Sequence, residues 1–186
     1  RLAELLDRDP DRIALAYAMM LSLPGTPVIY YGDEFGKLND HEYYKEQIRL
    51  TGKDDTRFLV RGRIDWDELE KELDREGSFH AEVFSRISKM VNTRRRYPAF
   101  GRGRLDMIEV KGTDGIPLEG IMAYYRTHGC NRILVLLNLG GEEKKFALPS
   151  AKLKAYEQDM LDQPVRKDLA SGTLIMAPRS YHWFFV

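Results

Sequence analysis

Hydrophobic residues near the beginning of the chain recur at helical spacing. Residues 9–23 place apolar side chains on one helical face, and Asp9 and Pro10 are typical of a helix cap and a first helical position. Pro24 and the glycine after it end this pattern. The next run, Val28 to Tyr31, is β-branched and aromatic without a polar interruption. It predicts a strand buried on both faces, as in a parallel sheet covered by helices.

The middle of the chain combines a long polar segment with a strongly amphipathic helix. Residues 37–78 are polar and weakly periodic, with a short helical pattern at residues 65–73. A connection of this length tends to be functional. The following helix is predicted to begin at Ser78 and to end before Pro98, and three arginines occupy its last turn. Its apolar stripe comprises Phe79, Val83, Phe84, Ile87, Met90 and Val91.

After Pro98 the pattern changes to short apolar or alternating runs, separated by glycine, asparagine, proline and charged residues. This spacing is typical of an antiparallel β-sandwich. We therefore predict a boundary near residues 98–103 between two domains, residues 1–99 and 100–186. The runs that predict strands are residues 104–110, 120–127, 132–140, 144–149, 172–178 and 180–186.

Composition limits the classes of function. The 186 residues carry 29 basic and 29 acidic side chains, so the formal net charge is zero, which argues against a nucleic-acid partner. The hydrophobic content of 43% is sufficient for a packed core. With one cysteine, Cys130, and four scattered histidines, we expect no disulfide, no metal site and no cofactor. No apolar run is long enough for a membrane helix, so we expect no membrane partner.

The chain begins without methionine, inside a helical pattern. We therefore expect the native N-terminus to lie upstream of residue 1. The absence of a signal peptide then says nothing about the compartment. Localisation stays open, with the cytoplasm favoured.

Two acidic motifs are candidates for a functional site. Asp33 and Glu34 follow the predicted strand, but adjacent strand residues point in opposite directions, so they cannot easily converge on one bond as a catalytic pair. We place them at the rim of a site instead. For the segment KDDTRF there are two alternatives. It is either a solvated loop, or it presents Arg57, held by Asp54 and Asp55, to a hydroxylated or anionic ligand.

Longer motifs resemble a known family. The segment ALAYAMMLSLPGTPVIYYGDEFG, residues 14–36, resembles the last helix–strand unit of the (β/α)8 barrel in the α-amylase superfamily, glycoside hydrolase family 13. The motifs LND (residues 38–40), DDTR (residues 54–57) and RIDWDE (residues 63–68) resemble amylosucrase and its sucrose-acting relatives.

The resemblance implies an α+β chain. Residues 1–99 would be the last αβα portion of the barrel, with a long loop after the eighth strand, and residues 100–186 an all-β antiparallel sandwich. Catalysis in this family is retaining, and its three carboxylates follow earlier strands, so no catalytic residue is expected in this chain. The chain alone would be inactive. The full-length enzyme would act on sucrose or an α-glucan.

The resemblance also implies a role for Arg57, which would form a salt bridge closing the bottom of the glucosyl pocket. Phe58 and residues 60–62 depart from the family pattern. The alternatives to amylosucrase are therefore a sucrose hydrolase, a trehalose synthase-like isomerase and an α-amylase-type hydrolase. The pocket rim would comprise Asp33, Glu34, Asp54 and Asp55.

Two further hypotheses do not depend on catalysis. The first is a non-catalytic carbohydrate-binding or interaction module, in which Tyr124, Tyr181 and Trp183 stack on sugars; packing of these residues in the core is the competing explanation. The second concerns residues 28–31, which lack neighbouring strands in this chain. We expect residues 1–35 to rearrange or to pair with another copy of the chain.

Overall fold

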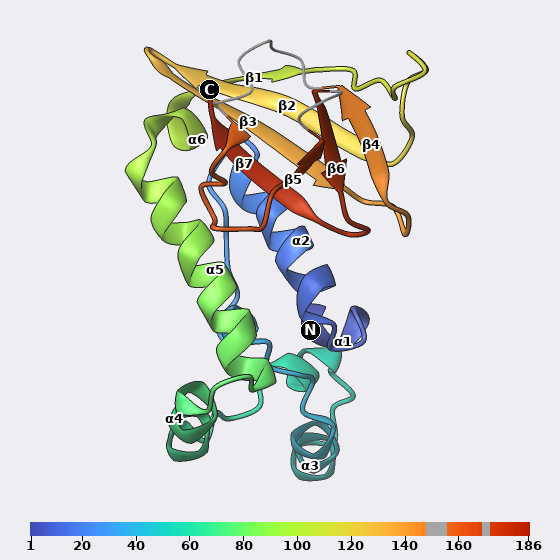
Figure 1. Cartoon of the computed structure of the whole chain (residues 1–186). Coiled ribbons are helices and arrows are strands. Elements are labelled where there is room, and N and C mark those ends of the chain that lie inside the picture. Colours follow the sequence, from blue (N-terminus) through green and yellow to red (C-terminus); the bar gives the residue numbers. More distant parts are fainter. Residues whose placement is uncertain (148–155, 169–171) are drawn as a thin grey trace. The chain divides into compact units, whose positions relative to one another are not determined.

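The computed structural model comprises two compact units (Figure 1). The first unit comprises residues 1–13 and 28–88, and the second comprises residues 14–27 and 89–186. The domain boundary predicted near residue 100 stays a prediction. The described residues are 1–147, 156–168 and 172–186.

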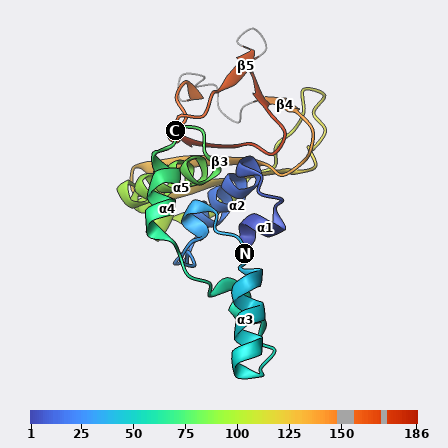
Figure 2. The same cartoon turned by 90° about the horizontal axis from the view of Figure 1, so that it is seen from below.

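The first unit is mostly helical. Figure 2 shows α3 along its length, and none of its residues is buried. The elements of this unit are α1 (Leu2–Leu5), the start of α2 (Pro10–Ser22), η1 (Asp33–Phe35), α3 (His41–Thr51), η2 (Thr56–Val60), α4 (Trp66–Asp74) and the first half of α5 (Phe79–Arg96).

Side-chain caps fix where these helices begin. Asp9 accepts hydrogen bonds from the N–H groups two and three residues later (2.9 and 3.2 Å), and Ser78 Oγ accepts one from the N–H three residues later (3.0 Å). Both predicted caps, and the helices that they begin, are confirmed. Asp40 and Asp65 cap α3 and α4 in the same way. Within the predicted apolar stripe of α5, Phe84 is an error, because it is 41% exposed.

The strand predicted for Val28 to Tyr31 is absent from the structure. This segment belongs to no helix or strand, and Val28 is 78% exposed. A β-strand requires a neighbour for its backbone N–H and C=O groups, and the residues that the structure describes supply none for this segment. The carbonyl group of Tyr31 accepts a hydrogen bond from the Arg1 guanidinium instead (2.5 Å).

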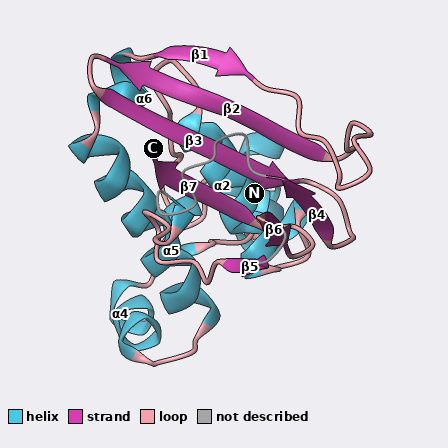
Figure 3. Ribbon diagram, turned by 45° about the horizontal axis from the view of Figure 1, so that its top comes forward, coloured by secondary structure: helices cyan, strands magenta, loops and turns pink. Residues whose placement is uncertain are grey.

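The second unit contains two antiparallel sheets, of order β1-β2-β3-β7 and β4-β6-β5 (Figure 3). A helical part followed by antiparallel sheets confirms the predicted α+β class. Its elements after α5 are α6 (Pro98–Arg102), β1 (Arg104–Met107), β2 (Ile121–His128), β3 (Asn131–Asn138), β4 (Lys144–Ala147), β5 (Arg166–Asp168), β6 (Thr173–Met176) and β7 (Tyr181–Phe185).

Every predicted run overlaps one of these strands, although residues 148 and 149 of the fourth run lie outside the described residues. β5 was not predicted, because its three residues are all charged and give no apolar signal. The core lies between the two sheets. There, Leu134 and Leu136 of β3 pack in one cluster with Phe146 of β4 and with Leu174 of β6.

The hypothesis that Tyr124, Tyr181 and Trp183 stack on sugars at the surface is wrong. Their exposed fractions are 0%, 4% and 0%. The Trp183 ring packs against Phe100 of α6, with ring centroids 4.6 Å apart, and the Tyr124 hydroxyl lies 2.6 Å from Ser22 Oγ. Buried residues occupy both faces of the larger sheet, so strand alternation leaves no solvated face for these rings.

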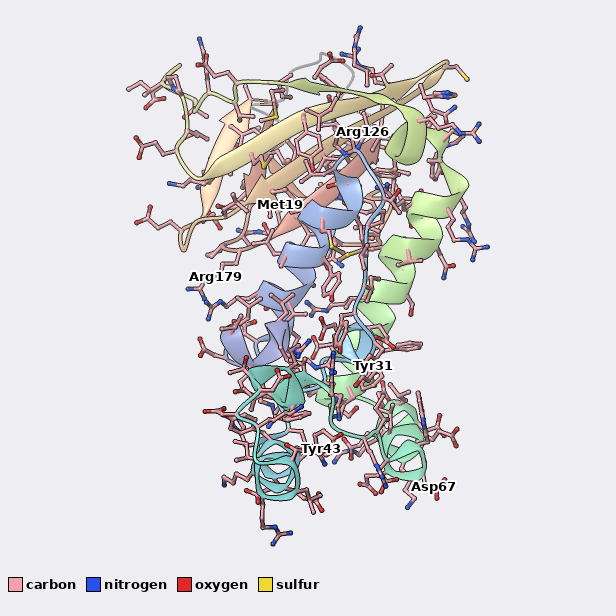
Figure 4. The ribbon with its side chains drawn as sticks, turned by 180° about the vertical axis from the view of Figure 1, so that it is seen from behind. Met19, Tyr31, Tyr43, Asp67, Arg126 and Arg179 are labelled. Atoms are coloured by element: carbon pink, nitrogen blue, oxygen red, sulfur yellow. The ribbon has the colours of Figure 1, made fainter. Side chains whose placement is uncertain are left out.

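Two arginines bind the carbonyl groups at the end of α2. Arg126 of β2, labelled in Figure 4, is fully buried and donates to Ser22 O (2.6 Å), Phe100 O (2.8 Å) and Gly103 O (2.9 Å). The last four carbonyl groups of a helix lack partners within it, and cations are favourable there. The second arginine, Arg94 of α5, donates to the carbonyl groups of Leu21, Leu23 and Gly25.

We predict that Arg126→Met lowers the free energy of unfolding by about 3 kcal/mol, because two buried carbonyl groups and one part-buried carbonyl group lose their donor. Urea unfolding followed by circular dichroism measures this change. The matched control is Arg104→Met on β1. The Arg104 side chain is 76% exposed and pairs with Asp106, so its loss should change stability by less than about 1 kcal/mol. Equal unfolding midpoints for the two variants would contradict the assigned role of Arg126.

We also predict that the isolated chain self-associates through residues 28–31. Val28, Tyr30 and Tyr31 are 78%, 42% and 43% exposed, and an exposed apolar segment that belongs to no sheet invites pairing between copies. Sedimentation velocity should show a concentration-dependent dimer that Val28→Lys suppresses. A monomer at every concentration would reject this expectation.

Candidate functional site

Arg57 lies in η2 and is held by one carboxylate. Its Nε donates to both carboxylate oxygens of Asp55 (2.8 and 2.9 Å), and its Nη2 donates to Asp55 Oδ2 (2.6 Å). Asp55 also caps η2 by accepting a hydrogen bond from the Arg57 backbone N–H (3.0 Å). The guanidinium is thus oriented by a bidentate pair. Its side chain is 69% exposed, and Nη1 contacts no acceptor among the described residues.

This pair changes the acid–base behaviour of both residues. The hydrogen bonds from the Arg57 side chain, with a smaller contribution from its backbone N–H, lower the pKa of Asp55 from 3.8 to about 2. The same hydrogen bonds raise the pKa of Arg57. The site therefore presents a fixed ion pair at neutral pH, with one edge of the cation free to meet a ligand.

Asp54 does not share Arg57. Its Oδ1 accepts a hydrogen bond from the Tyr44 hydroxyl of α3 (2.5 Å), which raises the pKa of Tyr44. The expectation that both carboxylates hold the arginine is therefore correct for Asp55 and wrong for Asp54. Asp54 instead attaches the segment before η2 to α3.

Asp33 lies in η1, between two glycines in the left-handed region (φ 90° at Gly32 and 75° at Gly36). A Cβ at Gly36 would lie 2.8 Å from the Phe79 ring, so the turn requires glycine there. The Asp33 carboxylate pairs with the buried Arg1 guanidinium (3.0 Å). Arg1 also donates to the carbonyl group of Val60 (2.5 Å), so it connects η1 to the end of η2.

Glu34 has a different environment from its neighbour. Its Oε2 is buried and has no hydrogen-bond partner among the residues that the structure describes. Tyr31, labelled in Figure 4, stacks on Arg1 with the guanidinium carbon 4.9 Å from the ring centroid. The two predicted rim acids thus differ in their contacts. The Asp33 carboxylate is bound to Arg1, whereas Oε2 of Glu34 accepts no hydrogen bond from the described residues.

A pocket of about 520 Å³ lies elsewhere in the first unit. The motifs LND and RIDWDE supply much of its wall through Leu38, Asn39, Asp40, Ile64 and Asp65. None of the five residues predicted for the site lines it. Both motifs were identified in the sequence. Because more than twenty residues separate them, the sequence did not predict that they line the same pocket.

Glu4 holds the LND segment in place. Its carboxylate accepts hydrogen bonds from the Asn39 backbone N–H and from Asn39 Nδ2 (both 3.0 Å), and it lies 3.1 Å from His41 Nε2. Burial alone would raise the pKa of Glu4, but the hydrogen bonds from His41 and Asn39 lower it overall. Sequence analysis missed this residue, because nothing local marks Glu4 as a partner of Asn39.

Two findings concern other kinds of site. Within residues 1–147, 156–168 and 172–186, no group of three or more His, Cys, Asp or Glu side chains is placed to hold a metal ion. No helix in this part of the chain is long and apolar enough to cross a membrane.

We predict that the carboxyl group of Asp55 titrates with a midpoint of about 2, since its pKa lies below the ordinary value of 3.8. The ion pair should persist at all higher pH values and be lost as the pH falls through 2. Carboxyl carbon NMR measures the midpoint. Arg57→Gln should move it back towards 3.8, whereas Arg63→Gln, outside the pair, should leave it unchanged. A native midpoint near 4 would exclude the pair in solution.

Comparison with known proteins is consistent with this architecture. A family profile described as the alpha-amylase SusG C-terminal domain matches residues 121–180. The trehalose synthase of Thermus thermophilus is 28% identical over 184 residues, covering 84% of this chain and 17% of that protein. The trehalose synthase/amylase TreS of Mycobacterium tuberculosis is 33% identical over 143 residues, covering 68% of this chain and 22% of that protein.

Solved structures show the same fold. The debranching enzyme from Nostoc punctiforme superposes with a TM-score of 0.64 at 20% identity, over 100% of this chain and 33% of that one. The chain thus spans about a fifth of the length of these curated relatives and a third of this solved structure. Profile, relatives and fold agree that the chain corresponds to the C-terminal part of enzymes of the α-amylase superfamily, glycoside hydrolase family 13.

Proposed function

We propose that the chain is the C-terminal segment of a retaining α-glucan-active enzyme of the trehalose synthase type. The parent would cleave a glucosyl bond through a covalent glucosyl–enzyme intermediate and pass the glucosyl group to a second sugar. The observation that carries the proposal is the Arg57–Asp55 pair, set in the DDTR segment of a chain whose relatives include trehalose synthases.

The relatives favour this assignment over an amylosucrase. The motifs LND and DDTR suggest sucrose cleavage, but two matched relatives are named trehalose synthases, and Phe58 and residues 60–62 depart from the amylosucrase pattern. An isomerase moves the glucosyl group from one hydroxyl of a glucose to another. A transferase or hydrolase acting on sucrose releases fructose. The two assignments therefore differ in their products.

Arg57 would act in substrate binding rather than in bond cleavage. Asp55 holds one edge of its guanidinium, and the free Nη1 points to a role as donor to a carboxylate or a sugar hydroxyl. A planar, permanently charged donor suits this task, because it fixes direction as well as charge. The rim would be completed by Asp33, Glu34 and Asp54. The catalytic carboxylates of the parent would all be supplied by residues outside this chain.

We predict that the 186-residue chain has no detectable turnover of maltose, sucrose or maltooligosaccharides. It has the proposed pocket arginine, but the family resemblance would place the catalytic carboxylates outside this chain. Trehalose formation from maltose, measured together with glucose and fructose release by the purified chain, tests this. Turnover by the chain itself would overturn the assignment of the catalytic residues to another part of the parent.

In the full-length parent, Arg57→Ala should lower kcat/KM for trehalose formation from maltose by about 100-fold, because a misplaced glucosyl ring loses its near-attack geometry. The matched control is Arg61→Ala. Arg61 is an exposed arginine directly after η2. Its charge contributes to the lowered pKa of Asp55, but its side chain forms no hydrogen bond or ion pair with the described residues. Its loss should change kcat/KM less than about threefold.

Near-native kinetics for Arg57→Ala would reject the role of Arg57 in the glucosyl pocket.

Product analysis of the unmodified parent separates the trehalose synthase assignment from the amylosucrase assignment. Trehalose formed from maltose supports the isomerase, whereas fructose released from sucrose at a higher kcat/KM supports the amylosucrase-like alternative.

A further inference from the structure

A polar groove of about 670 Å³ lies in the second unit, apart from the residues considered above. One wall is the last two turns of α5, the other is the loop of residues 157–162, and Phe185 at the end of β7 completes it. All of these residues belong to the second unit. The mechanism proposed for Arg57 uses none of them.

Two aromatic rings form an apolar platform in this groove. Tyr97, directly after α5, and Phe185 lie with ring centroids 5.6 Å apart and planes tilted by 45°. Phe185 is 44% exposed, whereas the rest of β7 is buried. Exposed aromatic faces offer apolar area to a ligand whose edges are polar.

Polar side chains surround the platform without partners. Asn92, Arg96 and Gln158 are exposed, line the groove, and form no side-chain hydrogen bond or ion pair with any residue that the structure describes. They supply both donors and acceptors. Unused hydrogen-bonding groups beside an exposed ring are the chemistry that a polyhydroxylated ring requires.

The groove carries no cationic excess. Its cations are Lys89 and Arg96, and its acids are Glu157, Asp162 and the buried Asp159; Lys89 and Asp162 form an ion pair with each other. A site for phosphate or another anion would carry a cationic excess. The lining therefore favours a neutral ligand.

The loop wall is held rigidly by a buried carboxylate. Asp159 is 2% exposed, and its oxygens accept hydrogen bonds from the backbone N–H groups of Leu161 (2.7 Å) and Trp183 (2.9 Å) and lie 3.0 Å from His182 Nδ1. The Met160 N–H also donates to Trp183 O (2.8 Å). Because the loop is fixed to β7, a ligand would meet a wall that is already formed, which lowers the entropy cost of binding.

We propose that this groove binds a neutral oligosaccharide, with a sugar ring stacked on Tyr97 and Phe185 and its hydroxyls bound by Asn92, Arg96 and Gln158. The identity of that sugar as an α-glucan rests on the proposed function. The groove chemistry itself requires only a neutral pyranose chain. The groove would hold glucan on the enzyme independently of catalysis.

Isothermal titration of the 186-residue chain with maltoheptaose tests this proposal, with mannohexaose as a second neutral sugar. We expect millimolar binding of maltoheptaose, weakened about tenfold in Phe185→Ala and in Tyr97→Ala by loss of the stacking surface. Because Tyr97 is half-buried, Asn92→Ala serves as a milder variant and should weaken binding about threefold. The control is Trp66, an aromatic residue outside this groove that is 60% exposed, compared with 44% for Phe185. The Trp66→Ala variant should bind maltoheptaose as the native chain does.

The outcomes separate the site from the proposed function. Binding of mannohexaose but not maltoheptaose, still dependent on Phe185, would keep the site and reject its assignment to glucan. No binding of either sugar at about 20 mM would overturn the site, whatever the kinetics of Arg57 variants. Native-like binding by all three groove variants would overturn it as well.

Discussion

The carbonyl end of α2 is the constraint on which the second unit depends. Ser22 is the last residue of the helix, and Pro24 in the turn after it has no backbone N–H to donate to the carbonyl groups at the helix end. Arg94 and Arg126 supply them from α5 and β2. Because Arg126 also binds the carbonyl group of Phe100 in α6, one buried cation fixes a helix end, a second helix and a strand. A buried charge is costly unless it is bonded, so other packings of these elements are disfavoured.

The Arg57–Asp55 pair, in contrast to Arg126, contributes little to the stability of the fold. Its guanidinium is largely exposed, and exposed ion pairs add little to stability. We propose that this pair, which adds little to the fold yet fixes the direction of a permanent cation and leaves one edge open, serves ligand binding. The same argument does not extend to Asp33, whose partner Arg1 is buried and connects two segments of the unit.

Local signals in the sequence identified most elements, and the main error, the strand at residues 28–31, concerns a non-local partner. The caps at Asp9 and Ser78 and the predicted strands depend on short-range chemistry, so they could be predicted. Residues 28–31 could not, since a strand is defined by a neighbour that the described residues do not provide. In the site, the Arg57–Asp55 contact was predictable, because the two residues are only two positions apart in the sequence. The pocket was not, because it depends on the meeting of the LND and RIDWDE motifs.

The position of the groove follows from how the larger sheet is covered. Alternation along a strand predicts one solvated face, but both faces of this sheet are buried, so Tyr124 and Trp183 lie in the core. β7 is buried from Tyr181 to Phe184 and exposed only at Phe185, where the covering layers end. In a sheet covered on both sides, an aromatic ring reaches solvent at the end of a strand rather than along its face. The strand end, beside the turn that carries Tyr97, is therefore where this fold leaves aromatic surface for a sugar.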